Sequence, residues 1–261
     1  TTLFVGGSFS NIATQSKNYL VSFDKTTGNL NTWNPAPNSS VYSIVLKGNR
    51  MYVGGNFSTI SGQPRDRLAL INTFNNNIAS TTWKPNPNGA VNTLVILNES
   101  LYAGGDFTLM GGQTRNYLAR LDTGGAAALN SWNPMVSSSV NALSTSGNSV
   151  IVGGNFQYVK FDSKNYLISY NTSTGLVNTW DSKSNSSIYS VKVNGQTVYA
   201  GGNFSNIGNQ TRNRLAALSL TTGNASTWNP NMNGAVNSIS FRDTLIYLGG
   251  DFTTVGNSNR P

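Results

Sequence analysis

The chain has 261 residues, of which 38% are hydrophobic and only 10% are charged. Its 17 Lys and Arg outnumber its nine Asp and Glu, so the formal net charge is +8, and it contains neither Cys nor His. These counts exclude disulfides, thiolate chemistry and imidazole metal ligands, and they remove the commonest general base. No stretch approaches 18 consecutive apolar residues, so we expect no membrane insertion.

A four-residue motif, Gly-Gly-x-Phe, recurs six times along the chain. Its first residues are Gly6, Gly54, Gly104, Gly153, Gly201 and Gly249, which gives successive steps of 48, 50, 49, 48 and 48 residues. A period this steady indicates one structural unit copied along the chain. Because no linker or change of composition interrupts the copies, we expect a single domain over residues 1–261, with partial first and last repeats.

The second copy shows the elements expected of each unit. Residues 41–46 form an apolar, β-branched run, and residues 51–53 begin a second run that ends at the glycine pair. After a polar loop, residues 67–71 predict a third strand and residues 81–83 a fourth. Four strands in about 49 residues predict a small antiparallel sheet. Such sheets must stack on copies of themselves, and radial stacking gives an all-β fold, the β-propeller with four-stranded blades.

The expected strands fill neither five nor six sheets of four, since the chain begins in a second strand and stops before a third is due. We therefore expect a piece of a longer array, with five to six repeats present and a complete ring of six or seven blades. Five blades with a displaced end strand are the alternative. An open sheet edge leaves backbone groups unpaired, so further repeats of the parent chain or a partner should cover it.

A tryptophan occurs once in each of five copies. A row of Trp side chains also suggests carbohydrate stacking, but strict repetition is what packing between neighbouring sheets requires. We expect each Trp to pack the outer strand of one sheet against the next, and each motif Phe to be buried between sheets. The glycine pair should allow a close backbone approach or a positive φ. The residues are Trp33, Trp83, Trp132, Trp180 and Trp228.

The basic residues have a period of their own, just before the expected third strand. One expectation is that each hydrogen-bonds to loop carbonyls of its own or the next repeat, and the alternative is a positively charged ring that binds anionic partners. No run of basic residues occurs, so we expect no nucleic-acid partner. The six residues at this position are Lys17, Arg65, Arg115, Lys164, Arg212 and Arg260.

The third copy carries the fullest version of the repeat. Residues 112–115 read Gly-Gln-Thr-Arg, residues 118–121 read Leu-Ala-Arg-Leu, and residues 132–134 read Trp-Asn-Pro. With Gly-Gly-x-Phe, this pattern resembles the delta-60 repeats of bacterial proteins and, more broadly, the kelch-like propeller repeats. The resemblance covers the whole chain. It implies a β-propeller and a large bacterial protein that is secreted or on the cell surface, with no general catalytic residue to carry over.

The fourth copy departs from this pattern. Its loop at residues 157–163 lacks the Gly-Gln pair, and Trp180 is followed by Asp-Ser instead of Asn-Pro. We expect Tyr158, Lys160 and Phe161 to belong to a partner-binding patch. Further candidates are the periodic basic residues Lys17, Arg65, Arg115, Lys164 and Arg212.

The few acidic residues lie mostly in turns or repeat-equivalent loops, so no pair of catalytic carboxylates is evident. We expect no enzymatic activity, no cofactor and no metal site. The expected function is a non-catalytic binding or scaffold module of a secreted or cell-surface protein, which presents loops to protein or glycan partners. The alternative is a purely architectural spacer or transported body, and a glycan-active enzyme is a third reading.

Overall fold

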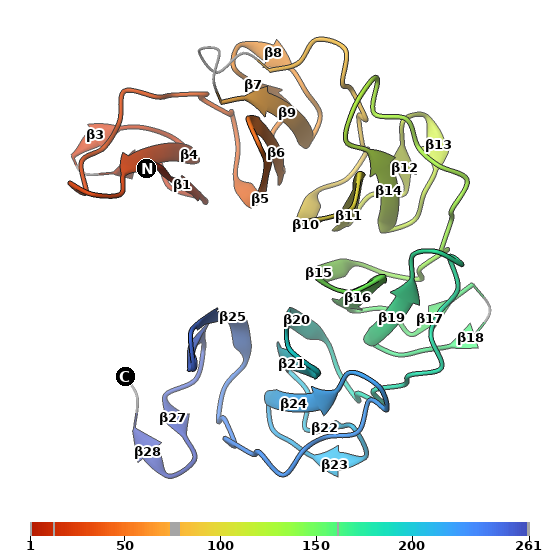
Figure 1. Ribbon diagram of the computed structural model, residues 1–261. Coiled ribbons are helices and arrows are strands. Elements are labelled where there is room, and N and C mark those ends of the chain that lie inside the picture. The colour runs from red at the N-terminus through yellow and green to blue at the C-terminus, as the bar shows by residue number, and fades with distance from the viewer. Residues whose placement is uncertain (1, 13, 74–78, 161, 260–261) are drawn as a thin grey trace. The chain divides into compact units, whose positions relative to one another are not determined.

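The computed structural model describes residues 2–12, 14–73, 79–160 and 162–259, which form 28 strands joined by turns and loops. Among these residues no helix is long and apolar enough to cross a membrane. The chain divides into two compact units, Thr1–Asn133 and Pro134–Pro261. Each repeat has one main antiparallel sheet and one small two-stranded hairpin (Figure 1). The main sheets are numbered 1 to 6 in chain order.

The first unit contains sheets 1 to 3. Sheet 1 pairs β1 (Thr2–Gly6) with β4 (Leu20–Asp24). Sheet 2 has the order β5 (Val41–Lys47), β6 (Arg50–Gly55), β9 (Leu68–Asn72), and sheet 3 has the order β10 (Val91–Leu97), β11 (Ser100–Gly105), β14 (Leu118–Asp122). Each loop before the last strand folds into a two-residue hairpin: β2 (Asn11–Ile12) with β3 (Gln15–Ser16), β7 (Thr59–Ile60) with β8 (Gln63–Pro64), and β12 (Leu109–Met110) with β13 (Gln113–Thr114).

The second unit contains sheets 4 to 6. Sheet 4 has the order β15 (Val140–Ser146), β16 (Ser149–Gly154), β19 (Leu167–Asn171), and sheet 5 has the order β20 (Ile188–Asn194), β21 (Thr197–Gly202), β24 (Leu215–Ser219). Sheet 6 pairs β25 (Val236–Arg242) with β26 (Leu245–Gly250). The hairpins are β17 (Tyr158–Val159) with β18 (Asp162–Ser163), β22 (Asn206–Ile207) with β23 (Gln210–Thr211), and β27 (Thr254–Val255) with β28 (Ser258–Asn259).

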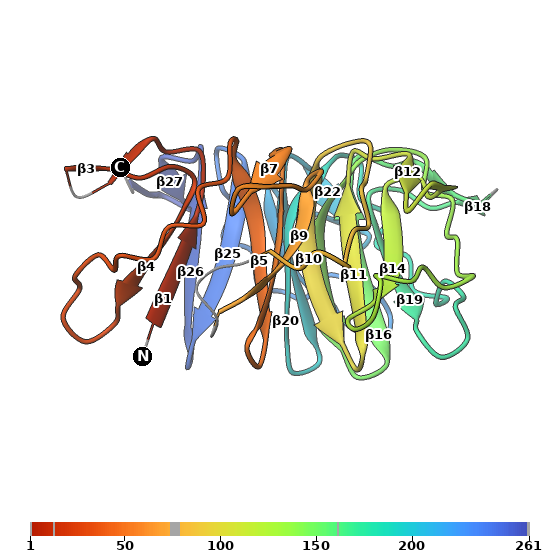
Figure 2. The same ribbon diagram turned by 90° about the horizontal axis from the view of Figure 1, so that it is seen from above.

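The hairpins lie at one edge of the sheets within each unit. In the first unit, β7 and β12 lie at the edge opposite the turns that join β5 to β6 and β10 to β11 (Figure 2). In the second unit, β18, β22 and β27 lie likewise at the edge away from the β20–β21 turn (Figure 2). The repeat therefore presents its hairpins and its tight turns on opposite edges.

The complete sheets have three strands, so the prediction of a fourth strand in each repeat is wrong. Residues 81–83 are irregular, and the fourth strand is reduced to a single bridge such as Ile71 with Ala79 or Leu121 with Leu129. Two causes act at this position. The Trp side chain turns toward the neighbouring sheet, and the proline that follows Trp in most copies has no N–H to continue a ladder.

The core consists of apolar clusters between consecutive sheets. In the first unit one cluster joins Leu20 of sheet 1 to Val41 and Met51 of sheet 2, and another joins sheets 2 and 3. In the second unit the clusters join sheet 4 to sheet 5 and sheet 5 to sheet 6. The sheets therefore stack face to face within each unit, as the repeat pattern predicted.

The glycine pair permits this stacking through close approach. A Cβ on Gly55 would lie 2.1 Å from the Ser40 carbonyl oxygen, and one on Gly54 would lie 2.7 Å from a methyl carbon of Val91 in sheet 3. The first glycine thus accommodates the next sheet, while the second accommodates the chain entering its own first strand. The motif side chains Phe57, Phe107, Phe156 and Phe204 are fully buried, as expected, whereas Phe9 and Phe252 are half-buried.

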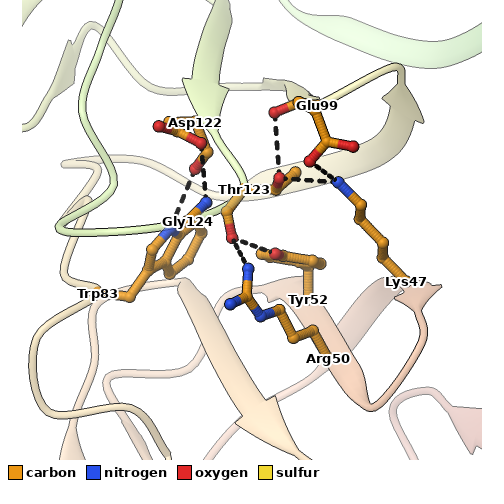
Figure 3. A network of polar contacts seen from close by, with 8 residues as sticks. All are labelled: Lys47, Arg50, Tyr52, Trp83, Glu99, Asp122, Thr123 and Gly124. Atoms are coloured by element: carbon orange, nitrogen blue, oxygen red, sulfur yellow. Dashed lines mark hydrogen bonds and ion pairs between the residues drawn. The ribbon is translucent and has the colours of Figure 1, made fainter.

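Trp83 and Trp180 are buried and pack as wedges between sheets, as predicted, whereas Trp228 is 37% exposed. The indole N–H of Trp83 in repeat 2 donates to the Asp122 carbonyl at the end of β14 in sheet 3, with N···O 3.2 Å (Figure 3). Its ring meets Tyr52 of its own sheet edge-on, with centroids 5.3 Å apart. Trp180 of repeat 4 donates in the same way to the Ser219 carbonyl at the end of β24, at 2.7 Å.

A polar network reinforces the contact between sheets 2 and 3 (Figure 3). The Thr123 carbonyl accepts hydrogen bonds from Arg50 Nη1 at 3.0 Å and from Tyr52 Oη at 2.5 Å. Lys47 forms an ion pair with Glu99 and donates to Thr123 Oγ1 at 3.1 Å. Burial raises the pKa of Tyr52, which keeps its hydroxyl in the donating form.

A candidate partner-binding patch on the fourth repeat

The periodic basic residues bond mainly to backbone carbonyls of their own repeats. Arg65 and Arg115 are buried, and they donate to the carbonyls of Ser80 and Asn130, with Arg65 Nε···O 3.0 Å and Arg115 Nη2···O 2.8 Å. Burial also lowers the pKa of Arg65. These guanidinium groups hold the segment that follows the third strand against the hairpin.

The remaining members of this set make similar contacts. Arg212 Nη2 donates to the Ser226 carbonyl at 2.5 Å, and Lys17 Nζ lies 3.2 to 3.3 Å from three consecutive carbonyls at residues 31–33. Lys164 instead approaches the Asp181 carboxylate at 3.9 Å. Arg260 lies outside the described residues. The expectation of hydrogen bonds to loop carbonyls is therefore confirmed for Lys17, Arg65, Arg115 and Arg212.

The hairpin of repeat 4 presents an exposed aromatic residue. Tyr158 begins β17 with 53% of its surface exposed, while the next residue, Val159, is buried and bridges to Val136. Ser137 fixes the Tyr158 backbone from both sides. Its N–H donates to the Tyr158 carbonyl at 3.1 Å, and its Oγ accepts from the Tyr158 N–H at 3.2 Å. The backbone is thus anchored while the ring faces solvent.

The turn of this hairpin contains a bulky residue in the left-handed region. Lys160, the first turn residue, is exposed and has φ 52°. Positive φ at the first position of a two-residue hairpin turn favours Gly, Asn and Asp. The equivalent first turn residues of other repeats are small: Ser61, Gly111, Gly208 and Gly256. Phe161, the second turn residue, lies outside the described residues.

Met135 lies against this turn and is also left-handed, as are Ala36, Asn86, Lys183 and Asn231 at the equivalent positions of other repeats. It has φ 50° with 42% of its surface exposed. The Lys160 N–H donates to the carbonyls of both Pro134 and Met135, at 3.3 and 3.1 Å. In repeat 5 the equivalent N–H of Gly208 makes one shorter bond to Ser182, at 2.5 Å. Backbone hydrogen bonds thus join Met135 to the hairpin that carries Tyr158 and Lys160, and these three exposed residues are called here the repeat-4 patch.

The sequence analysis predicted Tyr158 and Lys160 and missed Met135. The signal that pointed to the hairpin was its departure from the Gly-Gln pattern. Met135 follows an ordinary Trp-Asn-Pro segment 25 residues earlier, and only the hydrogen bond to Lys160 brings it to the hairpin. The equivalent position holds Ala36, Asn86, Lys183 and Asn231 in the other repeats, so residue type at this position does not mark Met135.

The comparisons with known proteins support the fold. Residues 49–75 and 100–127 match a family model described as "Domain of unknown function (DUF5122) beta-propeller". No curated protein matches the chain significantly. Among solved structures, the chain is similar to the computationally designed Ika8 protein, with a TM-score of 0.53 and 13% identity over 88% of this chain and 62% of that chain. The chain therefore spans less than two thirds of that solved chain, and at this identity the likeness concerns the fold alone.

The repeated antiparallel sheets agree with the β-propeller that the family match names. The two matched stretches cover the second and third strands of sheets 2 and 3. They fall on the part of the repeat where the glycine pair, the hairpin and the last strand follow one another.

Proposed function

We propose that this β-propeller is a non-catalytic binding module that takes a protein partner on the repeat-4 patch. One observation carries the proposal: Met135 and Lys160 adopt left-handed conformations side by side, beside the exposed Tyr158. A left-handed non-glycine residue costs on the order of 1 kcal/mol. At the first turn position other repeats place Ser61, Gly111, Gly208 and Gly256, so Lys160 carries a local cost that the hairpin itself does not require.

The chemistry of the patch favours a protein partner over a glycan. Met and Tyr are enriched at the centres of protein interfaces, where a flexible thioether and a rigid ring supply contact area. Lys160 adds a positive charge at the rim that selects an acidic or neutral partner surface. The resemblance to delta-60 repeats supports a secreted or cell-surface location for the protein. The second candidate function is that of an architectural spacer in a large surface protein.

The test is a site-specific crosslink followed by a measured affinity. A photoreactive phenylalanine replaces Tyr158 in the full chain, and a matched control carries it at Asn206, the equivalent exposed position of repeat 5. We expect a protein crosslinked from position 158 and not from position 206. Its Kd should then rise at least tenfold in the variant Met135→Asn, Tyr158→Thr, Lys160→Gly.

A second control distinguishes binding at this patch from nonspecific binding by the exposed hairpins. Leu109 occupies the position of Tyr158 in repeat 3 and is also exposed, so Leu109→Ser should leave the Kd unchanged. Equal affinity of the triple variant and the wild type, with the fold retained by circular dichroism, contradicts the proposal. Binding on a glycan array that survives the triple variant favours a glycan site elsewhere.

A further inference from the structure

A side chain from the segment that enters each repeat holds the first strand of that repeat's hairpin. In repeats 2, 3, 5 and 6 it is an asparagine, three residues before the main sheet begins. Its Oδ1 accepts from two consecutive backbone N–H groups, and its Nδ2 donates to a Ser or Thr hydroxyl, all at 2.8 to 3.1 Å. The pairs in this three-bond clamp are Asn38 with Ser58, Asn88 with Thr108, Asn185 with Ser205, and Asn233 with Thr253.

In repeat 4 both halves of this clamp are different. Ser137 stands in place of the asparagine, and Gln157 stands in place of the Ser or Thr. The Ser137 Oγ accepts from the N–H groups of Gln157 and Tyr158, at 3.1 and 3.2 Å. Serine lacks the amide that makes the third bond, and Gln157 lacks the hydroxyl that receives it. The clamp on β17 therefore keeps two of its three bonds.

The anchor on the other side of the hairpin also differs in repeat 4. Arg65, Arg115 and Arg212 each donate to a carbonyl of the segment that follows the third strand. Lys164 occupies this position in repeat 4, and its Nζ lies 3.9 Å from the Asp181 carboxylate. A lysine is a flexible point charge without the rigid fork of donors that arginine offers. The hairpin of repeat 4 thus has a looser side-chain anchor here.

Two backbone bonds of this hairpin are longer than their equivalents. The Lys160 N–H shares the carbonyls of Pro134 and Met135 at 3.3 and 3.1 Å, whereas the equivalent bonds of repeats 2, 3, 5 and 6 measure 2.5 or 2.6 Å. The Lys164 N–H donates to the Gln157 carbonyl at 3.2 Å, against 2.8 to 3.0 Å in repeats 2, 3 and 5. All the polar anchors compared are therefore weaker in repeat 4.

The apolar anchor does not distinguish repeat 4. Val159 is buried, and Ile60, Met110 and Ile207 are buried at the same position of other repeats. The difference between the hairpins thus lies in polar bonds at the surface, where water replaces each bond that breaks. Segments with few such bonds open locally at a smaller cost in free energy than the rest of a domain.

We propose that β17 detaches from Ser137 while the main sheets stay folded, so that Tyr158 and Lys160 adjust to the partner of the repeat-4 patch. The partner takes the detached strand and shifts the population toward it. The use of this motion rests on the proposed function, whereas the motion itself follows from the anchors. The equivalent strands of repeats 3 and 5, β12 and β22, stay attached.

Hydrogen exchange of the full chain measures detachment without a partner. After correction for intrinsic rates, the amides of residues 157 and 158 should exchange about tenfold faster than those of residues 205 and 206. The variant Ser137→Asn, Gln157→Ser restores the third bond, so exchange at 157 and 158 should slow about three- to tenfold. The matched reverse variant in repeat 5, Asn185→Ser, Ser205→Gln, should speed exchange at 205 and 206 by a similar factor.

Equal exchange in the hairpins of repeats 4 and 5 overturns this proposal, as does a restored clamp that leaves exchange at 157 and 158 unchanged. Urea unfolding verifies that both variants are folded.

The binding probe is the protein crosslinked from position 158. Its Kd should rise about three- to tenfold in the restored-clamp variant, because the detached state is then less populated. Equal or tighter binding shows that the partner takes the attached strand, and it overturns the proposal. Fast exchange at 157 and 158 that slows in the restored clamp, with no crosslinked protein, supports the detachment of β17 and contradicts the proposed function.

Discussion

The Lys160 N–H donates to the Met135 carbonyl at an N···O distance of 3.1 Å, and both residues have φ near +50°. In repeats 2 and 6 the equivalent bonds, Ser61 to Pro35 and Gly256 to Pro230, measure 2.6 Å and involve a single acceptor. Repeat 4 therefore keeps the architecture of the hairpin with a longer, shared hydrogen bond. Met135 and Lys160 are also exposed to solvent, which links local strain to a presented surface.

Relieving this strain should stabilise the protein. We expect Lys160→Gly to raise the free energy of unfolding by about 0.5–1 kcal/mol, because glycine adopts positive φ without steric cost although it gains entropy in the unfolded state. Urea unfolding measures the change. The reverse substitution at the equivalent position of repeat 6, Gly256→Lys, should destabilise by a similar amount. A loss of stability in Lys160→Gly would show that the side chain contributes packing that outweighs its strain.

The second glycine of each motif should tolerate no side chain. In Gly55→Ala the new Cβ would meet the Ser40 carbonyl at 2.1 Å, and backbone must move to admit it. We expect a loss of about 3 kcal/mol or more, or failure to fold. Gly147 is a suitable control, since nothing lies within 4 Å of a Cβ there and its φ of 51° suits Asn. Gly147→Asn should change the midpoint of thermal unfolding by a few degrees at most.

The buried arginines should matter for stability and not for partner binding. Arg65→Met removes charge-assisted bonds to the Ser80 and Pro64 carbonyls and leaves those acceptors without their donor. We expect a cost of about 2–3 kcal/mol in chemical unfolding, and a smaller cost for Arg212→Met, because Arg212 is less buried. An Arg65→Met protein with full stability and weakened binding to an anionic partner would instead support the anion-binding ring.

The raised pKa of the Tyr52 hydroxyl leads us to expect that the free energy of unfolding changes at alkaline pH. Burial raises its pKa, so the folded state keeps a proton that the unfolded chain releases near pH 10. The stability contributed by Tyr52 is therefore present below pH 10 and falls as the pH rises further. Unfolding free energies measured between pH 8 and pH 11 should decline less steeply in Tyr52→Phe. At neutral pH this variant should lose about 1 kcal/mol, since Thr123 loses one of its donors.

Much of the fold could be predicted from the sequence because the pattern of each element occurs in several repeats. Alternation of apolar residues and the position of the glycine pair predicted the first three strands of each repeat and their stacking. The prediction of the fourth strand was wrong. An aromatic residue beside a turn gives the same sequence pattern whether its backbone pairs in a sheet or its side chain packs against the next sheet. The side chain of Trp83 packs against the next sheet, where its indole N–H donates a hydrogen bond to the Asp122 carbonyl.

The candidate site was only half visible in the sequence. Tyr158 and Lys160 stood out because their loop lacks the Gly-Gln pair of other repeats, and a local departure of this kind is visible in the sequence. Met135 joins them through a backbone hydrogen bond across the hairpin, and such pairing depends on how the preceding loop folds back.

The glycine pairs have an evolutionary consequence. Gly54 and Gly201 each receive a Val side chain of the next sheet, and Gly153 receives Ile188 at the same place. Consecutive sheets in each unit therefore meet through interchangeable surfaces. Duplication or deletion of one whole repeat by recombination would join surfaces that already match, so proteins of this design can change length in steps of one repeat without redesigning their cores.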